Sequence, residues 1–151
     1  MPFTHQVNAD LLLAPERIIA HGCNAQGVMG SGVAKAIKEK WPGAYKEYRQ
    51  IYLDRGLTLG RNIHYHFRTD KKLIVNCITQ KNYGRDGKQY VDYVAVASCF
   101  AGLNKSAKFY EEENIAMPWI GCGLGGGDKK IVRQLMDIFI PDANVVVYEL
   151  N

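Results

Sequence analysis

Apolar residues recur along this chain at two spacings, one typical of helices and the other typical of strands. A spacing of three or four positions predicts helices over residues 31–48, 93–107 and 131–138. The first helix is expected to break and restart at Pro42, because proline lacks the backbone N–H that a helix interior needs. Short apolar or alternating runs predict strands over residues 3–7, 17–22, 62–67, 73–78, 114–120 and 144–150.

The order of these elements predicts an α/β fold. Strands that alternate with helices favour a three-layer α/β/α arrangement, with a central sheet covered by helices on both faces. A short turn between residues 67 and 73 predicts a hairpin, so the sheet is expected to be mixed and mostly parallel. A length of 151 residues suits one domain, residues 1–151. Ligands bind such sheets outside the carboxyl ends of the strands.

Composition and charge narrow the function classes. Apolar residues make up 47% and charged residues 23%, as in ordinary globular proteins. No apolar run approaches the length of a membrane span, and the N-terminus lacks a secretory pattern, so we expect a cytoplasmic protein without a membrane partner. The net charge of +4 is scattered, which makes nucleic acid an unlikely partner and leaves a small anionic ligand favoured. We expect a monomer.

Four cysteines lie far apart and form no CxxC pair, which argues against a zinc ribbon and a redox motif. They are Cys23, Cys77, Cys99 and Cys122. Without a secretory signal, buried thiols are favoured over disulfides. His64 and His66 alternate along a predicted strand without nearby acids, so we interpret them as surface or packing residues. No metal site and no cofactor are expected.

Two glycine-rich segments each connect a predicted strand to a predicted helix. The first spans residues 21–37 and contains Gly27, Gly30 and Gly32. It fails as a P-loop, because Val33 stands where lysine is required, and it fails as a dinucleotide fingerprint, because Lys35 stands where glycine is required. The second spans residues 117–130 and holds five glycines. Two such loops could close on one pyrophosphate from both sides.

At these residues the chain resembles a macrodomain, the module that binds ADP-ribose and its derivatives. The resemblance covers nearly the whole chain, and its motifs are specific only jointly. They are Ala9–Leu12, the segment NAQGVMGSGV at 24–33, IGCGLGGGD at 120–128 and the terminal run at 147–150. The segments at 21–34 and 79–93 look closest to the bacterial, phage and fungal branch that processes ADP-ribose 1''-phosphate.

The resemblance implies a role for each matching residue. Asp10 would accept a hydrogen bond from the adenine amino group, the Leu11 amide would bond a ring nitrogen, and Tyr148 would lie against adenine. Asn24 would bond the distal ribose. The loop contacts implied for the distal ribose, its phosphate and the diphosphate are Gly30, Ser31, Gly32, Val33, Gly121, Cys122, Gly123, Leu124, Gly125 and Gly126. Asp10 as a helix cap, Asn24 as a loop cap and Tyr148 as a buried strand residue are the structural alternatives.

The activity implied is metal-independent hydrolysis of ADP-ribose 1''-phosphate to ADP-ribose and phosphate. The catalytic residues expected are Asn24, which orients the ribose, and His21 or Asp128 as the group that transfers a proton or orients water. Asp86 is a weaker candidate for that role. A buried core histidine and a helix cap are the alternatives for His21 and Asp128.

Two other functions stay open. A related branch removes ADP-ribose from macromolecules through a lysine that follows an Ile-Thr pair, but here Gln80 follows Thr79 and lysine comes only at Lys81. One residue along a strand reverses the direction of a side chain. That branch also carries aspartate where this chain has Gly125, so the sequence disfavours it. A non-catalytic module that binds ADP-ribose or ADP-ribosylated macromolecules would use the same loops as a phosphatase.

Overall fold

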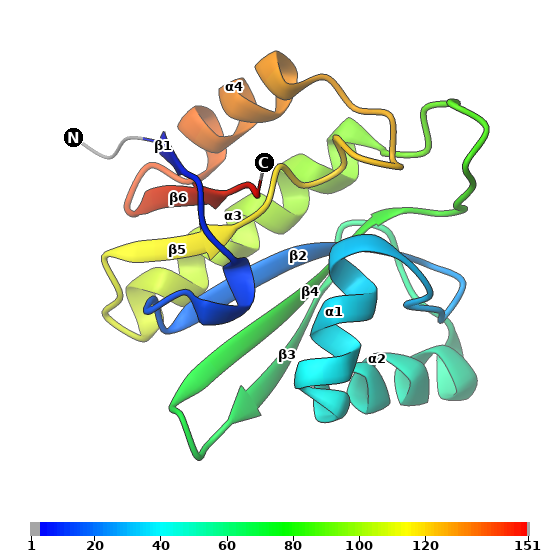
Figure 1. Cartoon of the computed structure of the whole chain (residues 1–151), viewed down its shortest axis with the longest axis horizontal. Helices are drawn as coiled ribbons and strands as arrows, with labels where there is room; N and C mark the ends of the chain where they lie inside the picture. The colour runs from blue at the N-terminus through cyan, green and yellow to red at the C-terminus, as the bar shows by residue number, and fades with distance from the viewer. Residues whose placement is uncertain (1–3, 151) are drawn as a thin grey trace.

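A central sheet runs through the computed structural model, which describes residues 4–150 (Figure 1). Within this range its six strands lie in the order β1-β6-β5-β2-β4-β3. Their bounds are β1 Thr4–Val7, β2 Ile18–Asn24, β3 Asn62–Phe67, β4 Lys72–Gln80, β5 Asn114–Met117 and β6 Asn144–Tyr148. Only β3 runs antiparallel to its neighbour, β4, and the other pairs are parallel. The predicted mixed, mostly parallel sheet is therefore confirmed.

Helices cover both faces of this sheet, so the predicted three-layer α/β/α fold is also confirmed (Figure 1). They are η1 Leu11–Leu13, a short 3-10 turn that was not predicted, α1 Gly32–Lys40, α2 Pro42–Arg55, α3 Tyr93–Phe109 and α4 Lys129–Phe139. Ile37 of α1 and Ala44 of α2 pack on one face, against Ile19 of β2. Phe100 of α3 and Met136 of α4 pack on the other face.

Pro42 divides the first helical stretch as predicted. Trp41 ends α1 and precedes α2, and Pro42 takes the first position of α2, where no helix hydrogen bond requires its missing N–H. Trp41 is 2% exposed, so the break lies in the core rather than in solvent. No helix in the described range is both long and apolar enough to cross a bilayer.

Several strand ends differ from the prediction, and the differences shape the edge of the sheet. The strands predicted over 114–120 and 144–150 end at Met117 and Tyr148. Pro118 has no backbone N–H to donate to a neighbouring strand. The last residue pair between β5 and β6 is Met117 with Val147, so β6 has no β5 partner beyond Val147. In contrast, β2 and β4 extend beyond the predicted ends at 22 and 78, because they pair with each other as far as Asn24 and Gln80. Position 3 of the first predicted strand lies outside the described residues.

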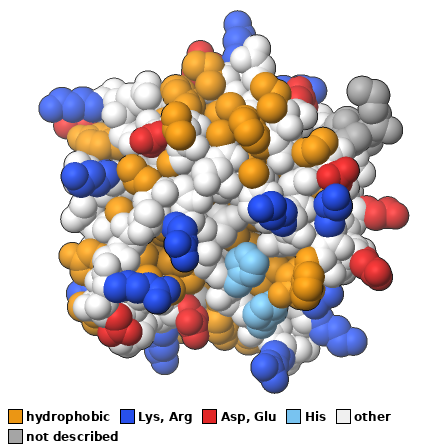
Figure 2. Space-filling view, turned by 180° about the vertical axis from the view of Figure 1, so that it is seen from behind, with side chains coloured by type: hydrophobic (Ala, Val, Ile, Leu, Met, Phe, Trp, Pro, Cys, Tyr) orange, Lys and Arg blue, Asp and Glu red, His pale blue; other side chains and the backbone are white. Residues whose placement is uncertain are grey.

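Three of the four cysteines are buried as predicted, and all four are free. Cys122 is only partly buried, because it lies in the second glycine loop rather than in a core element. Charge is mixed on the face of the molecule that Figure 2 shows, where Lys and Arg side chains alternate with acidic and apolar ones. On that face they form no continuous basic stripe.

His21, a predicted candidate for proton transfer, is fully buried in the core between β2 and α2. Its Nε2 lies 2.6 Å from Asn76 Oδ1, and Asn76 Nδ2 donates to the Ala44 carbonyl oxygen at 3.0 Å. Because the Asn76 NH₂ group donates to Ala44, the Asn76 oxygen faces His21 and accepts from it. The His21 Nε2 must therefore carry the proton. Burial lowers the pKa of His21 to about 4, so the imidazole is neutral at pH 7. This geometry matches the alternative of a core histidine.

The low pKa of His21 predicts a loss of stability in mild acid. The unfolded chain takes up this proton near pH 6.5, whereas the folded protein takes it up only near pH 4. Stability is therefore fully present above pH 6.5 and is lost as the pH falls toward 4, by about 2 kcal/mol between pH 7 and pH 5. Urea unfolding at both pH values should show this loss in the wild type, and a smaller loss in His21→Gln. Equal losses in the two proteins would contradict the assignment.

Candidate functional site

A cleft of about 870 Å³ opens at the carboxyl edge of the parallel strands. Both glycine loops and the segments that follow β4 and β6 contribute to its walls. The volume lies in the range of small-molecule sites. The two loops, far apart in the sequence, therefore border one cavity, as the sequence suggested.

Most of the predicted site residues line this cleft. They are Asn24, Gly30, Ser31, Gly32, Val33, Gly121, Cys122, Gly123, Leu124, Gly125 and Tyr148. Their individual ligand contacts remain predictions. Burial raises the pKa of the Cys122 thiol to about 11, so this sulfur is neutral at pH 7. Tyr148 is only 9% exposed, and its hydroxyl donates to Glu16, which fits the alternative of a buried strand tyrosine as well as an adenine contact.

The other predicted residues do not line the cleft. His21 is enclosed in the core. Asp10 precedes η1, where its Oδ1 accepts from the Leu12 N–H at 2.9 Å, and Leu11 is the first residue of η1. Gly126 has a φ of +72°, and a Cβ there would lie 2.7 Å from the Lys88 carbonyl oxygen, so it packs against the segment after β4.

The two aspartates proposed as proton-transfer groups both have structural partners elsewhere. Asp128 is the N-cap of α4, because its Oδ1 accepts from the Lys130 N–H at 2.8 Å. Asp86 accepts from the Tyr90 hydroxyl at 2.8 Å and also lies outside the cleft lining. The structure therefore brings none of His21, Asp128 and Asp86 to the cleft. His21 was expected there because it ends a predicted strand, and Asp128 because it follows the second glycine loop, but neither position determines where the side chain is held.

Asn24 organises the first glycine loop. Its Oδ1 accepts from the Gln26 N–H at 2.9 Å, and its Nδ2 donates to the Val28 carbonyl oxygen at 3.0 Å. The Tyr48 hydroxyl lies 2.6 Å from the Asn24 backbone carbonyl oxygen and 2.9 Å from Oδ1. Tyr48 comes from α2 and is fully buried, so the loop is tied to the helical layer below it. These bonds use one of the two Nδ2 hydrogens, which leaves one for a ligand.

The N-terminus of α1 differs from those of η1, α3 and α4. In those three, an aspartate side chain accepts from a first-turn N–H, whereas Ser31 makes no such bond at α1. The N-terminus of α2 also lacks a side-chain cap, but Trp41 and Pro42, where that helix begins, do not line the cleft. Ser31, Gly32 and Val33 line the cleft, so this uncapped end presents free N–H groups and a partial positive charge to it. The arrangement suits an anion.

The second glycine loop is tightly folded against Gln80. Tyr90 and Val91 donate to the Gly125 carbonyl oxygen at 2.7 and 3.0 Å, which joins the loop to the segment after β4. A Cβ at Gly125 would lie 2.7 Å from the Gly121 carbonyl oxygen and 2.9 Å from Gln80 Oε1. An aspartate at this position would therefore require the loop to shift.

Gln80 and Lys81 lie in different cavities. Gln80 lines the main cleft, and its Nε2 donates to the Asn82 carbonyl oxygen at 2.8 Å. Lys81 lines a second cavity of about 440 Å³, together with Tyr90 and Asp92. Lys81 is the first residue after β4, which ends at Gln80, and it does not line the main cleft. Thr79, just before them, lines the main cleft with a buried hydroxyl that has no hydrogen-bond partner among residues 4–150.

Several residues that line the cleft were not predicted. They are Gln80, Tyr83, Arg85, Trp119, Lys129 and Glu149. Tyr83 and Arg85 belong to an exposed segment without hydrophobic periodicity, and Trp119 was assigned to a strand that ends before it. The one signal in the sequence that the strand ends before Trp119 was Pro118, since proline terminates strands. Arg85 and Lys129 supply positive charge to the cleft, and Glu149 is ion-paired with Lys129.

No group of three or more His, Cys, Asp or Glu side chains within residues 4–150 is arranged to hold a metal ion. The chemistry that the described side chains offer is thus hydrogen bonding and positive charge, directed at an anionic ligand of nucleotide size.

Sequence comparison finds relatives over most of the chain. It is 32% identical over 146 residues to the "Uncharacterized 17.5 kDa protein in tk-vs intergenic region" of Enterobacteria phage T4, covering 91% of this chain and 89% of the phage protein. It is 30% identical to a DNA ADP-ribosyl glycohydrolase of Mycobacterium tuberculosis, covering 93% of this chain but only 40% of that protein. It is 26% identical to an ADP-ribose 1''-phosphate phosphatase of Candida albicans, covering 82% of this chain and 80% of the relative.

Among solved structures, the macrodomain of Thermus aquaticus DarG is similar, with a TM-score of 0.82 and 26% identity over 97% of each chain. The model of the Macro domain family matches residues 20–136, which include most of β2, both glycine loops and most of α4. On the match to this family model and the shared fold, the chain belongs to the Macro domain family.

Proposed function

We propose that this macrodomain binds ADP-ribose derivatives and hydrolyses ADP-ribose 1''-phosphate to ADP-ribose and inorganic phosphate. The observation that carries the choice of reaction is the placement of Gln80 and Lys81. Gln80 lines the cleft beside Gly125, while Lys81 lies in a separate cavity. A covalent lysine mechanism lacks its nucleophile and its aspartate at these positions, whereas hydrolysis by water needs neither.

The cleft suits a diphosphate that carries a sugar at each end. The uncapped N-terminus of α1 supports one side, and the backbone of the second glycine loop supports the other. Adenine is proposed to lie at the β1 and β6 end, because Val7 and Tyr148 are paired there and Asp10 and Leu11 follow the end of β1 by three and four residues. The Oδ1 of Asp10 caps η1, which leaves its second oxygen for the adenine amino group.

The hydrolysis is proposed to proceed by attack of water on the 1''-phosphate. The bond between phosphorus and the ribose oxygen breaks, and that oxygen takes a proton from solvent, giving ADP-ribose and phosphate. Arg85 and the loop N–H groups would stabilise the charge on the phosphoryl oxygens, and the free Nδ2 hydrogen of Asn24 would orient the distal ribose. In residues 4–150, Glu149 is the one carboxylate of the cleft lining, and it is paired with Lys129. Positioning and charge stabilisation therefore carry the proposed mechanism.

A glycohydrolase is the second candidate, because the mycobacterial relative that is 30% identical is named a DNA ADP-ribosyl glycohydrolase. Lys129 is the one lysine of the cleft lining in the described chain, and its Nζ lies 3.0 Å from Glu149 Oε1. The Lys129 amine is thus engaged by Glu149, and Gln80 stands at the position that follows the Ile78-Thr79 pair. A binding module without turnover would use the same contacts, and phosphate release separates it from the first candidate.

Loss of Arg85 should slow phosphate release without affecting the fold. We expect Arg85→Met to lower kcat/KM for ADP-ribose 1''-phosphate about 100-fold, because a charge-stabilising group at the phosphate is lost. Lys88→Met is the matched control, since Lys88 lies in the same segment, outside the cleft lining, in an exposed pair with Asp86. Phosphate release and melting curves should be measured for both. Equal rates for the two variants would contradict the role of Arg85.

Loss of Asn24 should be far more harmful than loss of Lys81. Asn24→Ala misplaces the distal ribose and should reduce phosphate release ~100-fold, whereas Lys81→Ala should keep most of it. Tyr48→Phe keeps the ring and removes the hydroxyl contacts to Asn24 and to the Val28 carbonyl oxygen, so it measures how much of the loss comes from a loosened loop. An inactive, well-folded Lys81→Ala beside an active Asn24→Ala, with a covalent adduct trapped by borohydride, would favour the glycohydrolase instead.

A further inference from the structure

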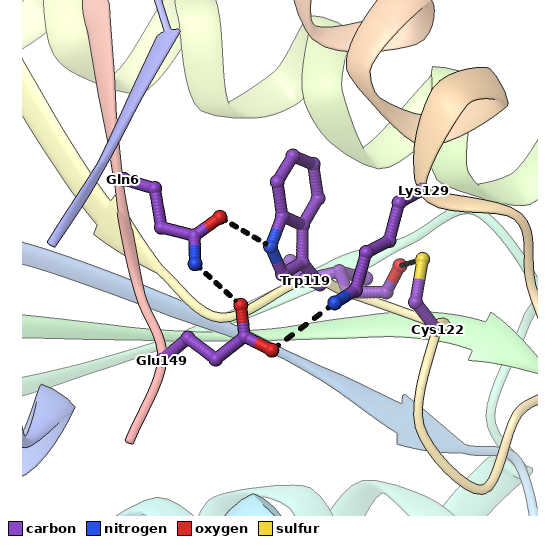
Figure 3. A network of polar contacts seen from close by, with 6 residues as sticks. Gln6, Trp119, Cys122, Lys129 and Glu149 are labelled. Carbon is purple, nitrogen blue, oxygen red and sulfur yellow. Dashed lines mark hydrogen bonds and ion pairs between the residues drawn. The ribbon is translucent and has the colours of Figure 1, made fainter. Parts of the chain in front are cut away.

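Four side chains from four different elements form a chain of polar contacts beside the cleft (Figure 3). Trp119 Nε1 donates to Gln6 Oε1 at 3.2 Å, and Gln6 Nε2 donates to Glu149 Oε2 at 2.6 Å. The other carboxylate oxygen of Glu149 accepts from Lys129 Nζ at 3.0 Å, and this Nζ also lies 5.9 Å from the centre of the Trp119 ring. Every polar atom of the indole is thereby bonded, and the ring is held in one orientation.

The network lies at one end of the cleft. Gln6 belongs to β1, Trp119 follows β5 and Glu149 follows β6, and these three strands are neighbours in the sheet. Asn24 ends β2 and Arg85 follows β4, which lie on the other side of β5. Trp119 and Tyr148 thus line the end of the cleft beside β5 and β6, while Asn24, Arg85 and the exposed Tyr83 line the end beside β2 and β4.

Trp119 is unlike the other tryptophan of the chain. Trp41 is 2% exposed in the core below α1, its Nε1 has no hydrogen-bond partner among the described residues, and it does not line the cleft. Trp119 is partly exposed, lines the cleft and packs against the core cluster that α3 and α4 cover. An indole fixed in this way offers a flat apolar surface to a ligand at low entropic cost.

We propose that Trp119 is the wall that holds the nucleoside half of the ligand, and that Gln6, Glu149 and Lys129 are positioning residues that fix its ring. This proposal rests on the proposed binding of ADP-ribose and adds a specificity determinant to it. The ion pair between Lys129 and Glu149 is largely exposed, so its contribution is to orientation rather than to stability. The same pairing neutralises the Glu149 carboxylate, which would otherwise repel a diphosphate.

The test compares ADP-ribose with ribose 5-phosphate, which lacks the nucleoside. Trp119→Ala should weaken ADP-ribose binding roughly tenfold or more, because stacking of a base on an aromatic ring is lost. Gln6→Leu removes both of the Gln6 bonds and should weaken ADP-ribose about threefold to tenfold, with an unchanged melting temperature. Ribose 5-phosphate binding should be the same in all variants. Lys105→Gln, a substitution on the exposed face of α3, is the neutral control.

Tryptophan fluorescence gives a second readout that a purely structural role would not move. ADP-ribose should change the emission of the wild type, and Trp119→Phe should abolish that change while it keeps ADP-ribose affinity within about threefold. A wild-type protein that binds no ADP-ribose would overturn the proposed function itself. If the wild type binds ADP-ribose but Trp119→Ala binds it equally well, or loses ribose 5-phosphate to the same degree, the role of Trp119 is overturned and the proposed function stands.

Discussion

β2 and β4 lie side by side in the sheet, and their parallel pairing carries Asn24 and Gln80 to the same edge. The rest of the cleft depends on this pairing. It is reinforced from below by the buried link of His21 and Asn76 to Ala44 of α2, which joins both strands to one helical layer. A neutral imidazole is required there, because a charged one would be buried without a counter-ion. The residue that resembled a catalytic histidine therefore supports the site from within the core.

The helix N-termini differ in whether an aspartate side chain caps them, and this difference indicates where a ligand would bind. Aspartates cap η1, α3 and α4, and Asp128 is one of them, so those helix ends are occupied by the protein itself. The N-terminus of α1 and the hydroxyl of Thr79 are left without side-chain partners, and both border the cleft. An unpaired polar group near a cavity costs stability unless water or a ligand satisfies it. Of the three buried side-chain atoms without a partner in residues 4–150, the Thr79 hydroxyl borders the cleft, while the other two belong to Trp41 and Asn62.

The second glycine loop shows why one substitution changes the chemistry available to the fold. Gly125 leaves room for Gln80 and for the Gly121 carbonyl oxygen, and a side chain there would collide with both. The lysine that follows Gln80 lies in another cavity. The cleft of this macrodomain therefore combines amide groups, backbone N–H groups and the Arg85 cation, a set suited to orienting a phosphate and stabilising its charge.

The periodic spacing of apolar residues was sufficient to predict the layers of the fold. Apolar spacing placed the helices, proline placed the break at Pro42, and the two glycine loops marked the cleft, because each of these signals acts within a few residues. The presence of Gln80, rather than lysine, after the Ile78-Thr79 pair was also readable from the sequence. Only the tertiary structure decided that β6 lies between β1 and β5, that His21 is sealed in the core, and that Gln6 reaches Trp119 and Glu149. These contacts join residues far apart in the chain, and strand order, which no local pattern encodes, determines which of them meet.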